Sequence, residues 1–298
     1  MKRKLLFKGT ATALVTPFKR DGSVDESTMR DLVERQIRGN VDALVPVGST
    51  GEGATLTDQE QAAVIEMVVE QVRGRVPVIA GASSNATVKA IALGKQAKSC
   101  GADAMLSVAP YYNKPTQEGI YRHFAAIADA VEMPLVVYNV PGRTASNIDA
   151  KTLRRIAEEI PYVIGVKESS GNFAQIMEIL RERPPGFGVW SGDDNIALPA
   201  IALGADGIVS VIANETPKLF SDMIRHALKG RLDKARALHY QLLDLMNANF
   251  VESNPIPVKA AMTLMGLIEE VYRLPLVPPG EEARPRIESA LRNLRLIP

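Results

Sequence analysis

The stretch of sequence that decides the fold is PLVVYNVPGRTASNIDAKTLRRIAEEIPYVIGVKESS, residues 134–170. An apolar run opens it at 134–141, another closes it at 163–170, and helix-length sequence separates the two. Neither run alternates with polar residues, as is typical of strands buried on both faces of a parallel sheet. The stretch therefore predicts a strand, a helix and a second strand parallel to the first.

The same pattern repeats along the chain. Six further apolar runs, each bounded by Gly or Pro, are TATALVTPF (10–18), ALVPVG (43–48), PVIAGA (77–82), AMLSVAP (104–110), GVWSGD (188–193) and GIVSV (207–211). Eight runs at intervals of about 30 residues match the strand count of a closed barrel, whereas a doubly wound sheet more often has about five to seven strands. We expect an α/β fold, a (β/α)8 TIM barrel formed by residues 1–216.

Short junctions that contain glycine support this regularity. Gly39, Gly101 and Gly204 each follow helix-length sequence, and each is followed within a few residues by Asp and then by an apolar run. Glycine commonly ends a helix because it adopts left-handed backbone angles without steric cost. Residues 217–298 contain helical patterns but no strand-like run, so we expect a C-terminal helical extension packed on the barrel.

The composition excludes several classes of partner. A formal net charge of +1 provides no electrostatic footprint for nucleic acid or an anionic membrane. The basic start, MKRKLLFKG, has too short an apolar run for a secretory signal, and no later run approaches the roughly 20 apolar residues that span a bilayer. The single cysteine, Cys100, cannot form an internal disulfide. We expect a cytoplasmic protein that binds neither nucleic acid nor membrane.

Polar residues follow four of the predicted strands. They are Ser49-Thr50-Gly51-Glu52, Tyr111-Tyr112-Asn113, Tyr138 to Arg143, and Lys167-Glu168. The active site of a (β/α)8 barrel lies at the carboxyl ends of its strands, so these residues are the first candidates for chemistry.

Lys167 ends the apolar run that begins at Val163. Period-2 alternation places Val163, Gly165 and Lys167 on one side of the strand, and Gly165 leaves room beside the lysine. If that side faces the barrel interior, burial disfavours the charged ammonium and favours a neutral amine nucleophile. A strand-end lysine that extends to solvent is the alternative that this residue alone leaves open.

Tyr138 and Thr50 are candidates for proton transfer beside this lysine. Alternation places Tyr138 on the same side as Val136, where it can face Lys167 on the neighbouring strand. Formation of a Schiff base takes several proton transfers, which a phenol near the amine and a hydroxyl near the phenol can mediate. The alternatives are a core tyrosine for Tyr138 and, for Ser49 or Thr50, a cap on the following helix.

The remaining polar residues leave more than one interpretation open. Arg143 follows a Pro-Gly turn, where a guanidinium can hold a carboxylate through two hydrogen bonds, although a solvated charge explains it as well. Turn formation and helix capping explain Asp193 and Asp194 as well as a metal does. The histidines show no metal-ligand spacing, and GSTGEG (48–53) lacks the lysine of a P-loop. We expect no metal and no cofactor.

Six motifs follow one another along the chain. They are GSTGE (48–52), PYYNKPTQEG (110–119), YNVPGRT (138–144), GVKESSGN (165–172), SGDD (191–194) and NPIPVK (254–259). Together they resemble the dihydrodipicolinate synthase / N-acetylneuraminate lyase family over nearly the whole chain. The resemblance implies class I aldolase chemistry, in which pyruvate forms a Schiff base with a barrel lysine and the resulting enamine attacks an aldehyde or is released from one.

The resemblance also implies a role for each site residue. Lys167 matches the Schiff-base lysine, and Tyr138 matches the tyrosine that carries protons to it. Thr50 and Tyr112 match the rest of a proton relay, in which Tyr112 reaches in from a neighbouring subunit. The residues that match the wall of the pyruvate pocket are Ser49, Thr50, Gly192 and Val209. The family further suggests a homotetramer built from tight dimers.

YNVPGR, with Arg143, resembles the dihydrodipicolinate synthase branch of the family. The resemblance implies that Arg143 binds the carboxylate of aspartate 4-semialdehyde, in the step of lysine and diaminopimelate biosynthesis that makes 4-hydroxy-tetrahydrodipicolinate. Tyr111 beside Tyr112 agrees with this branch, and sialic acid lyases typically lack the arginine. The alternatives are another pyruvate-dependent aldolase, acting on a 2-keto-3-deoxy sugar acid or 4-hydroxy-2-oxoglutarate, and a barrel that only binds a small ligand.

The sequence departs from the family pattern at the site where lysine inhibits some members. Lysine-inhibited members of the family bind lysine at the tight-dimer interface, and this chain keeps two residues of that site, Tyr111 and Asn85. It has Asp58 and Gln61 at the histidine positions and Lys89 at the glutamate position. A cation at the place of the effector's ammonium is repulsive, so we expect weak inhibition by lysine or none.

Overall fold

The structure, a computed structural model, describes residues 5–298, so the prediction for the first four residues of the N-terminal segment falls outside it. Eight strands form one sheet. They are β1 (Gly9–Ala13), β2 (Ala43–Val45), β3 (Ile79–Gly81), β4 (Ala104–Val108), β5 (Leu135–Asn139), β6 (Val163–Glu168), β7 (Gly188–Ser191) and β8 (Gly207–Ser210). Each strand overlaps one of the eight predicted apolar runs.

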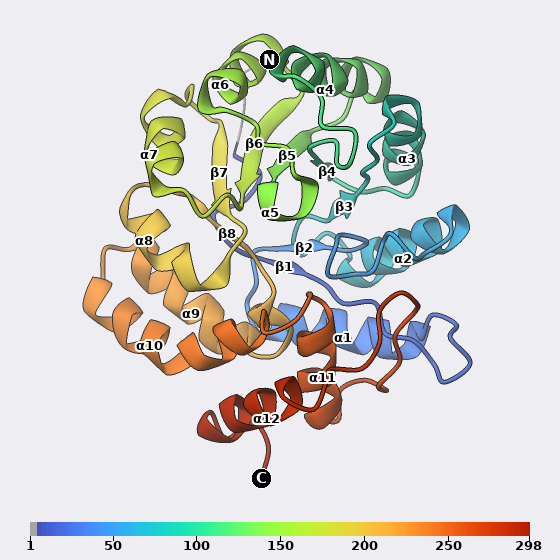
Figure 1. Cartoon of the computed structure of the whole chain (residues 1–298), viewed down its shortest axis with the longest axis vertical. Helices are drawn as coiled ribbons and strands as arrows, with labels where there is room; N and C mark the ends of the chain where they lie inside the picture. The colour runs from blue at the N-terminus through green and yellow to red at the C-terminus, as the bar shows by residue number, and fades with distance from the viewer. Residues whose placement is uncertain (1–4) are drawn as a thin grey trace.

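The sheet closes into a barrel. Its strands pair in the order β2-β1-β8-β7-β6-β5-β4-β3, and the pairs are parallel. Between the two ends of this order, Leu44 and Val78 form a parallel bridge, and the amide of Leu44 donates to the carbonyl of Pro77 at 3.0 Å. The prediction of a parallel (β/α)8 barrel is therefore confirmed (Figure 1).

Helices surround the strands (Figure 1). They are α1 (Glu26–Arg38), α2 (Asp58–Val72), α3 (Thr87–Ser99), α4 (Gln117–Val131), α5 (Pro141–Thr144), α6 (Ala150–Glu159), α7 (Phe173–Glu182), α8 (Ala197–Ala202) and α9 (Pro217–Leu228), with 3-10 turns η1 (Asp194–Ile196) and η2 (Ile212–Asn214). Gly39 ends α1, and a Cβ there would lie 2.4 Å from the Cβ of Pro217, so only glycine allows α1 and α9 to approach this closely.

An inner core fills the barrel. Buried side chains from all eight strands meet there, and the stacked rings of Phe7 and Trp190, 4.7 Å apart, form part of it. One prediction for β6 is wrong, because Val163 packs outside the barrel while Ile164 faces the inside. A β-bulge in the pairing of β5 with β6 causes this, since an extra residue breaks the period-2 alternation.

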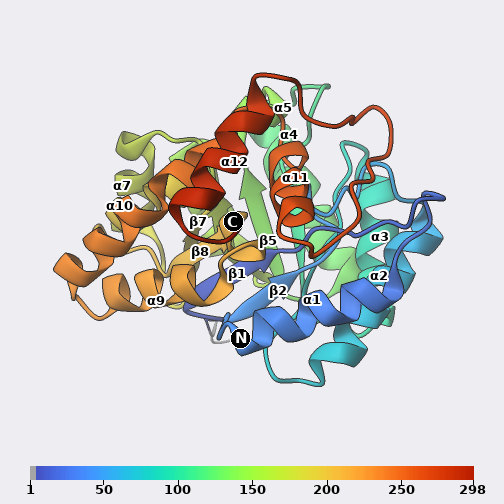
Figure 2. The same ribbon diagram turned by 90° about the horizontal axis from the view of Figure 1, so that it is seen from below.

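The C-terminal segment continues as helices. α9 contacts β1 and α1 and so takes the place of the eighth barrel helix. It is followed by α10 (Leu232–Ala248), α11 (Ile256–Leu264) and α12 (Ala283–Asn293), which share an apolar core with α8 and α9. Figures 1 and 2 show α10, α11 and α12 together on one side of the barrel. The domain boundary at 216/217 stays a prediction. Among the described helices, none is long and apolar enough to span a membrane.

Candidate active site

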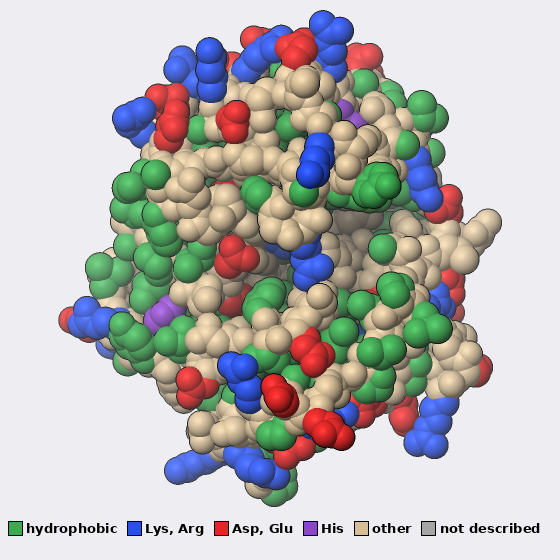
Figure 3. All heavy atoms as spheres, viewed as in Figure 1, with side chains coloured by type: hydrophobic (Ala, Val, Ile, Leu, Met, Phe, Trp, Pro, Cys, Tyr) green, Lys and Arg blue, Asp and Glu red, His purple; other side chains and the backbone are tan. Residues whose placement is uncertain are grey.

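A cavity of about 360 Å³ opens at the carboxyl ends of the strands. Figure 3 shows a hollow near the centre of this face, with basic side chains beside it. Six of the polar residues that follow the predicted strands line the cavity: Ser49, Thr50, Tyr111, Tyr138, Arg143 and Lys167. The fold thus brings residues that are far apart in the sequence to one place, as the barrel topology predicts.

Lys167 is buried on β6, with 6% of its surface exposed. Its partner in the strand register is Tyr138 on β5, and the Lys167 Nζ lies 4.3 Å from the centroid of the Tyr138 ring. No ion pair joins Lys167 to a carboxylate within residues 5–298. The predicted burial of Lys167 is therefore confirmed.

Gly192, rather than Gly165, provides room for this lysine. A Cβ at position 165 would lie 2.5 Å from Cζ3 of Trp190, so the space beside Gly165 belongs to the indole ring and the prediction for Gly165 is wrong. A Cβ at position 192 would lie 2.7 Å from Lys167 Cε and 1.8 Å from Ser169 Oγ. Any larger residue at 192 would displace the side chain of Lys167.

Thr50 lies in the loop after β2, where it is 3% exposed and lines the cavity. Its Oγ1 accepts a hydrogen bond from Nδ2 of Asn254 at 2.9 Å. The suggested alternative, a helix cap, is wrong because α2 begins at Asp58 and the side chain of Thr57 caps it. Neither Ser49 nor Thr50 is needed for that cap, so both remain available to the cavity.

Arg143 lies on the short helix α5, directly after β5. Its Nη2 donates to the backbone carbonyl of Asn254 at 3.0 Å, which holds the guanidinium at the wall of the cavity. Burial raises the pKa of Asp193, while the positive charges of Lys167 and Arg143 lower it. Asp193 is therefore a neighbour of both Lys167 and Arg143, a placement that its sequence context does not reveal because a turn, a helix cap or a metal site explains it equally well.

Asp194 fixes the end of β8. Its Oδ2 accepts from the amides of Val211 at 3.1 Å and Ile212 at 2.9 Å, and burial raises its pKa to about 6. In the part of the chain that the structure describes, no three His, Cys, Asp or Glu side chains are grouped to hold a metal ion. Asp194 therefore acts within the fold, through backbone hydrogen bonds.

Three predicted residues lie apart from the cavity wall. Tyr112 is 89% exposed and has a positive φ of 72°, so its side chain stands away from the cavity of its own chain. Val209 is buried in the inner core, where β8 pairs with Ala11 on β1. Gly192 lies against the aliphatic part of Lys167.

The structure also locates the residues that stand at the positions of the family's lysine-binding site. The Asn85 Nδ2 donates to the carbonyl of Tyr111 at 3.2 Å, and Lys89 and Asp58 are exposed on α3 and α2. Gln61 is buried and lines the main cavity, where its Nε2 donates to the carbonyl of Gly53 at 2.9 Å.

The motif NPIPVK contributes two buried polar residues whose contacts were not predicted. Asn254 contacts Thr50 and Arg143, as described above. Lys259 on α11 is fully buried, forms an ion pair with Glu52, and has its Nζ 4.4 Å from the centroid of the Phe18 ring. A lysine within the apolar segment IPVKAAMTL is the signal that could have indicated a buried partner, although its identity requires the fold.

The fold and this cavity define a (β/α)8 barrel with a candidate active site at the carboxyl ends of its strands. The chain belongs to the dihydrodipicolinate synthetase family, whose model matches residues 6–294.

Relatives and solved structures agree with this family. A 4-hydroxy-tetrahydrodipicolinate synthase of Koribacter versatilis is 54% identical over 94% of both chains, and one of Chloroherpeton thalassium is 50% identical over 100% of this chain and 98% of its own. The crystal structure of a dihydrodipicolinate synthase from Acinetobacter baumannii, described as chloride-inhibited and complexed with pyruvate, is 43% identical with a TM-score of 0.95, over 97% of this chain and 99% of that one.

Proposed function

We propose that the protein is a lyase that condenses pyruvate with aspartate 4-semialdehyde to give 4-hydroxy-tetrahydrodipicolinate, in lysine and diaminopimelate biosynthesis. Its family and its relatives at about half sequence identity support this activity. The observation that carries the proposal is Lys167, buried beside Tyr138 in a cavity whose wall also holds Arg143.

The chemistry begins at Lys167. Its neutral amine forms a bond to C2 of pyruvate, the carbonyl oxygen takes up protons and leaves as water, and a proton lost from C3 gives an enamine. The enamine carbon then bonds to the aldehyde carbon, whose oxygen takes a proton. The amino group of the semialdehyde attacks C2, which closes the ring and releases the amine of Lys167. Tyr138, 4.3 Å from the amine by its ring centroid, and Thr50 move these protons, and Tyr112 completes the relay.

The second substrate carries a carboxylate, which Arg143 binds. A guanidinium offers paired donors that match the two oxygens of a carboxylate. The backbone carbonyl of Asn254 fixes Arg143 without neutralising it, so its charge stays available to the substrate. Ser49 and Thr50 line the cavity and contact pyruvate, while Gly192 packs against Lys167 and Val209 lies in the inner core behind the wall.

The exposed Tyr112 supports an assembly in which this side chain enters the site of a neighbouring subunit. We propose a homotetramer made of tight dimers. A mixture of Lys167→Ala and Tyr112→Phe chains tests this, because each mixed dimer contains one site with both residues intact. Recovery of activity on mixing supports the exchange of Tyr112, and no recovery rejects it.

Inhibition by lysine is proposed to be weak or absent. Lys89, exposed on α3, places a positive charge where the effector's ammonium would bind. Inhibition at sub-millimolar lysine would refute this proposal. The single cysteine, Cys100, is buried and free, which suits a reducing cytoplasm.

Substrate assays test the proposed function. Purified protein with pyruvate should consume aspartate 4-semialdehyde in preference to forming or cleaving 2-keto-3-deoxy sugar acids or 4-hydroxy-2-oxoglutarate. Preference for one of those acids would place the protein with another aldolase activity. Arg143→Ala should depress turnover of the semialdehyde and leave the reaction with pyruvate alone largely intact.

A further inference from the structure

The C-terminal segment reaches the candidate active site through Asn254. The side-chain Nδ2 of Asn254 donates to Oγ1 of Thr50 at 2.9 Å, and its backbone carbonyl accepts from Nη2 of Arg143 at 3.0 Å. Asn254 is 6% exposed and Thr50 is 3% exposed, so water does not compete freely for their contact. One residue thus touches both the hydroxyl and the guanidinium of the site.

The direction of the bond between Asn254 and Thr50 constrains the Thr50 proton. A hydroxyl has one proton to donate and two lone pairs that accept, whereas an amide nitrogen only donates. Because Oγ1 accepts from Asn254, the single proton of Thr50 must be donated to some other group. Thr50 lines the cavity that holds Tyr138 and Lys167, so that group lies on the cavity side or is the substrate itself.

We propose that Asn254 is a positioning residue, which orients the Thr50 hydroxyl as a proton donor toward the cavity while its backbone holds Arg143. This inference rests on the proposed function, since it assigns a direction to the proposed proton relay. Asn254 is not itself a relay member, because it contacts Thr50 and Arg143 but not the reacting atoms.

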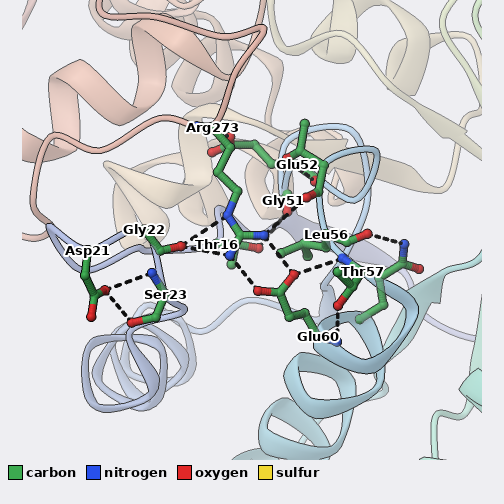
Figure 4. A network of polar contacts seen from close by, with 12 residues as sticks. Thr16, Asp21, Gly22, Ser23, Gly51, Glu52, Leu56, Thr57, Glu60 and Arg273 are labelled. Atoms are coloured by element: carbon green, nitrogen blue, oxygen red, sulfur yellow. Dashed lines mark hydrogen bonds and ion pairs between the residues drawn. The ribbon is translucent and has the colours of Figure 1, made fainter.

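Neighbouring contacts brace the same segment without reaching Thr50. Figure 4 shows Arg273 between the Gly22 loop and the start of α2, where its guanidinium meets the Glu60 carboxylate at 2.6 Å and 2.8 Å. Its Nη2 also donates to the carbonyl of Gly22 at 2.8 Å. Glu60 therefore offers a matched control, because it ties the C-terminal segment to α2 and lies outside the site.

Asn254→Asp tests the proposal, because a carboxylate only accepts and so draws the Thr50 proton to itself. Pyruvate is mixed with wild type or variant, samples are quenched into borohydride at timed intervals, and the adduct on Lys167 is followed by mass. The trapping rate should fall by about 10²-fold, the lower end of what acid-base groups contribute. The KM for the semialdehyde should change little, because the backbone contact to Arg143 remains.

The pH dependence of the trapping rate distinguishes a positioning role of Asn254 from a general disruption of the site. As the pH falls and the new carboxyl becomes protonated, it regains a proton to donate, so the ratio of variant to wild-type trapping rates should rise. Asn254→Ala should lose less than Asn254→Asp and show no such rise. Equal losses in both variants with no recovery in acid would overturn the proposal, as would the failure of both variants to fold.

Glu60→Gln should lower the melting temperature and leave the trapping rate at the wild-type value. A loss of trapping rate in Glu60→Gln that matches Asn254→Asp would mean that general bracing explains the effect, and the proposal would be wrong. If wild type forms no adduct, the proposed function fails. If wild type forms the adduct and Asn254→Asp traps at the same rate, only the role of Asn254 fails.

Discussion

Two buried lysines lie near residues of the loop that follows β2, and their surroundings differ. Lys259 is fully buried, forms an ion pair with Glu52 and lies against the rings of Phe18 and Tyr272. Lys167 is almost as buried but faces the cavity, with the Tyr138 ring as its neighbour and no ion pair within the described residues. Burial alone therefore does not identify a reactive lysine. What differs is that an ion pair with Glu52 holds Lys259, whereas Lys167 forms no such ion pair among the described residues and lines the cavity.

His123 illustrates what burial does to a basic group that lacks an anionic partner. It is 5% exposed on α4, and its Nδ1 contacts the Thr87 hydroxyl at 2.9 Å. Burial lowers the pKa of His123 to about 4, so the ring stays neutral near pH 7. Burial also lowers the pKa of Lys259, although the charge of Glu52 and its hydrogen bond raise it in part. We therefore expect substitution of Lys167 to affect activity and substitution of Lys259 to affect stability.

The largest expected effect is on activity, at Lys167. Lys167→Ala should abolish the pyruvate adduct and turnover, while the melting temperature stays the same or rises, because a buried amine without a partner is removed. Activity assays and thermal unfolding check both parts. A folded Lys167→Ala protein that keeps wild-type turnover would break the comparison, since Lys167 would then be an ordinary buried lysine.

Lys259→Met, in contrast to Lys167→Ala, should destabilise the fold. It leaves the Glu52 carboxylate buried without its partner, which should cost about 3–5 kcal/mol in the free energy of unfolding. Urea unfolding measures this loss, and the double variant Lys259→Met/Glu52→Gln should regain much of it because the unpaired charge is gone. If Lys259→Met is as stable as wild type, the ion pair does not support the fold and the contrast with Lys167 disappears.

The smallest expected effect concerns His123 and pH. Below its ordinary pKa of about 6.5, the unfolded chain takes up a proton that the folded chain refuses until about pH 4, so stability falls as the pH falls through this range. Between pH 7 and pH 5, wild type should lose roughly 2 kcal/mol more than His123→Gln. Equal losses in the two proteins, measured by urea unfolding, would show that His123 does not resist protonation.

The sequence predicts the barrel well because its signals are local. Each strand is an apolar run of its own, and the number and spacing of the runs imply closure before any contact is known. The same local reasoning fails on β6, because a bulge shifts Val163 out of register with Lys167. A bulge depends on how two strands pair, and the sequence pattern of one strand carries no information about that pairing.

The cavity is predicted in part. Strand-end position identifies Thr50, Tyr138 and Lys167 because barrel topology alone brings strand ends together. It does not identify Asn254, which lies in the C-terminal segment and reaches Thr50 across 204 positions of the chain. A contact between residues so far apart in the sequence follows from tertiary packing. The motif NPIPVK therefore indicates membership of the family but does not reveal the role of Asn254.

The central claim is that Lys167 forms the Schiff base, and borohydride trapping tests it most directly. Protein incubated with pyruvate and borohydride is digested, and the peptides are weighed. We expect one reduced pyruvate on the peptide that contains Lys167, and none on the peptide that contains Lys259. An unmodified Lys167 peptide, or an adduct on another lysine, would contradict the account.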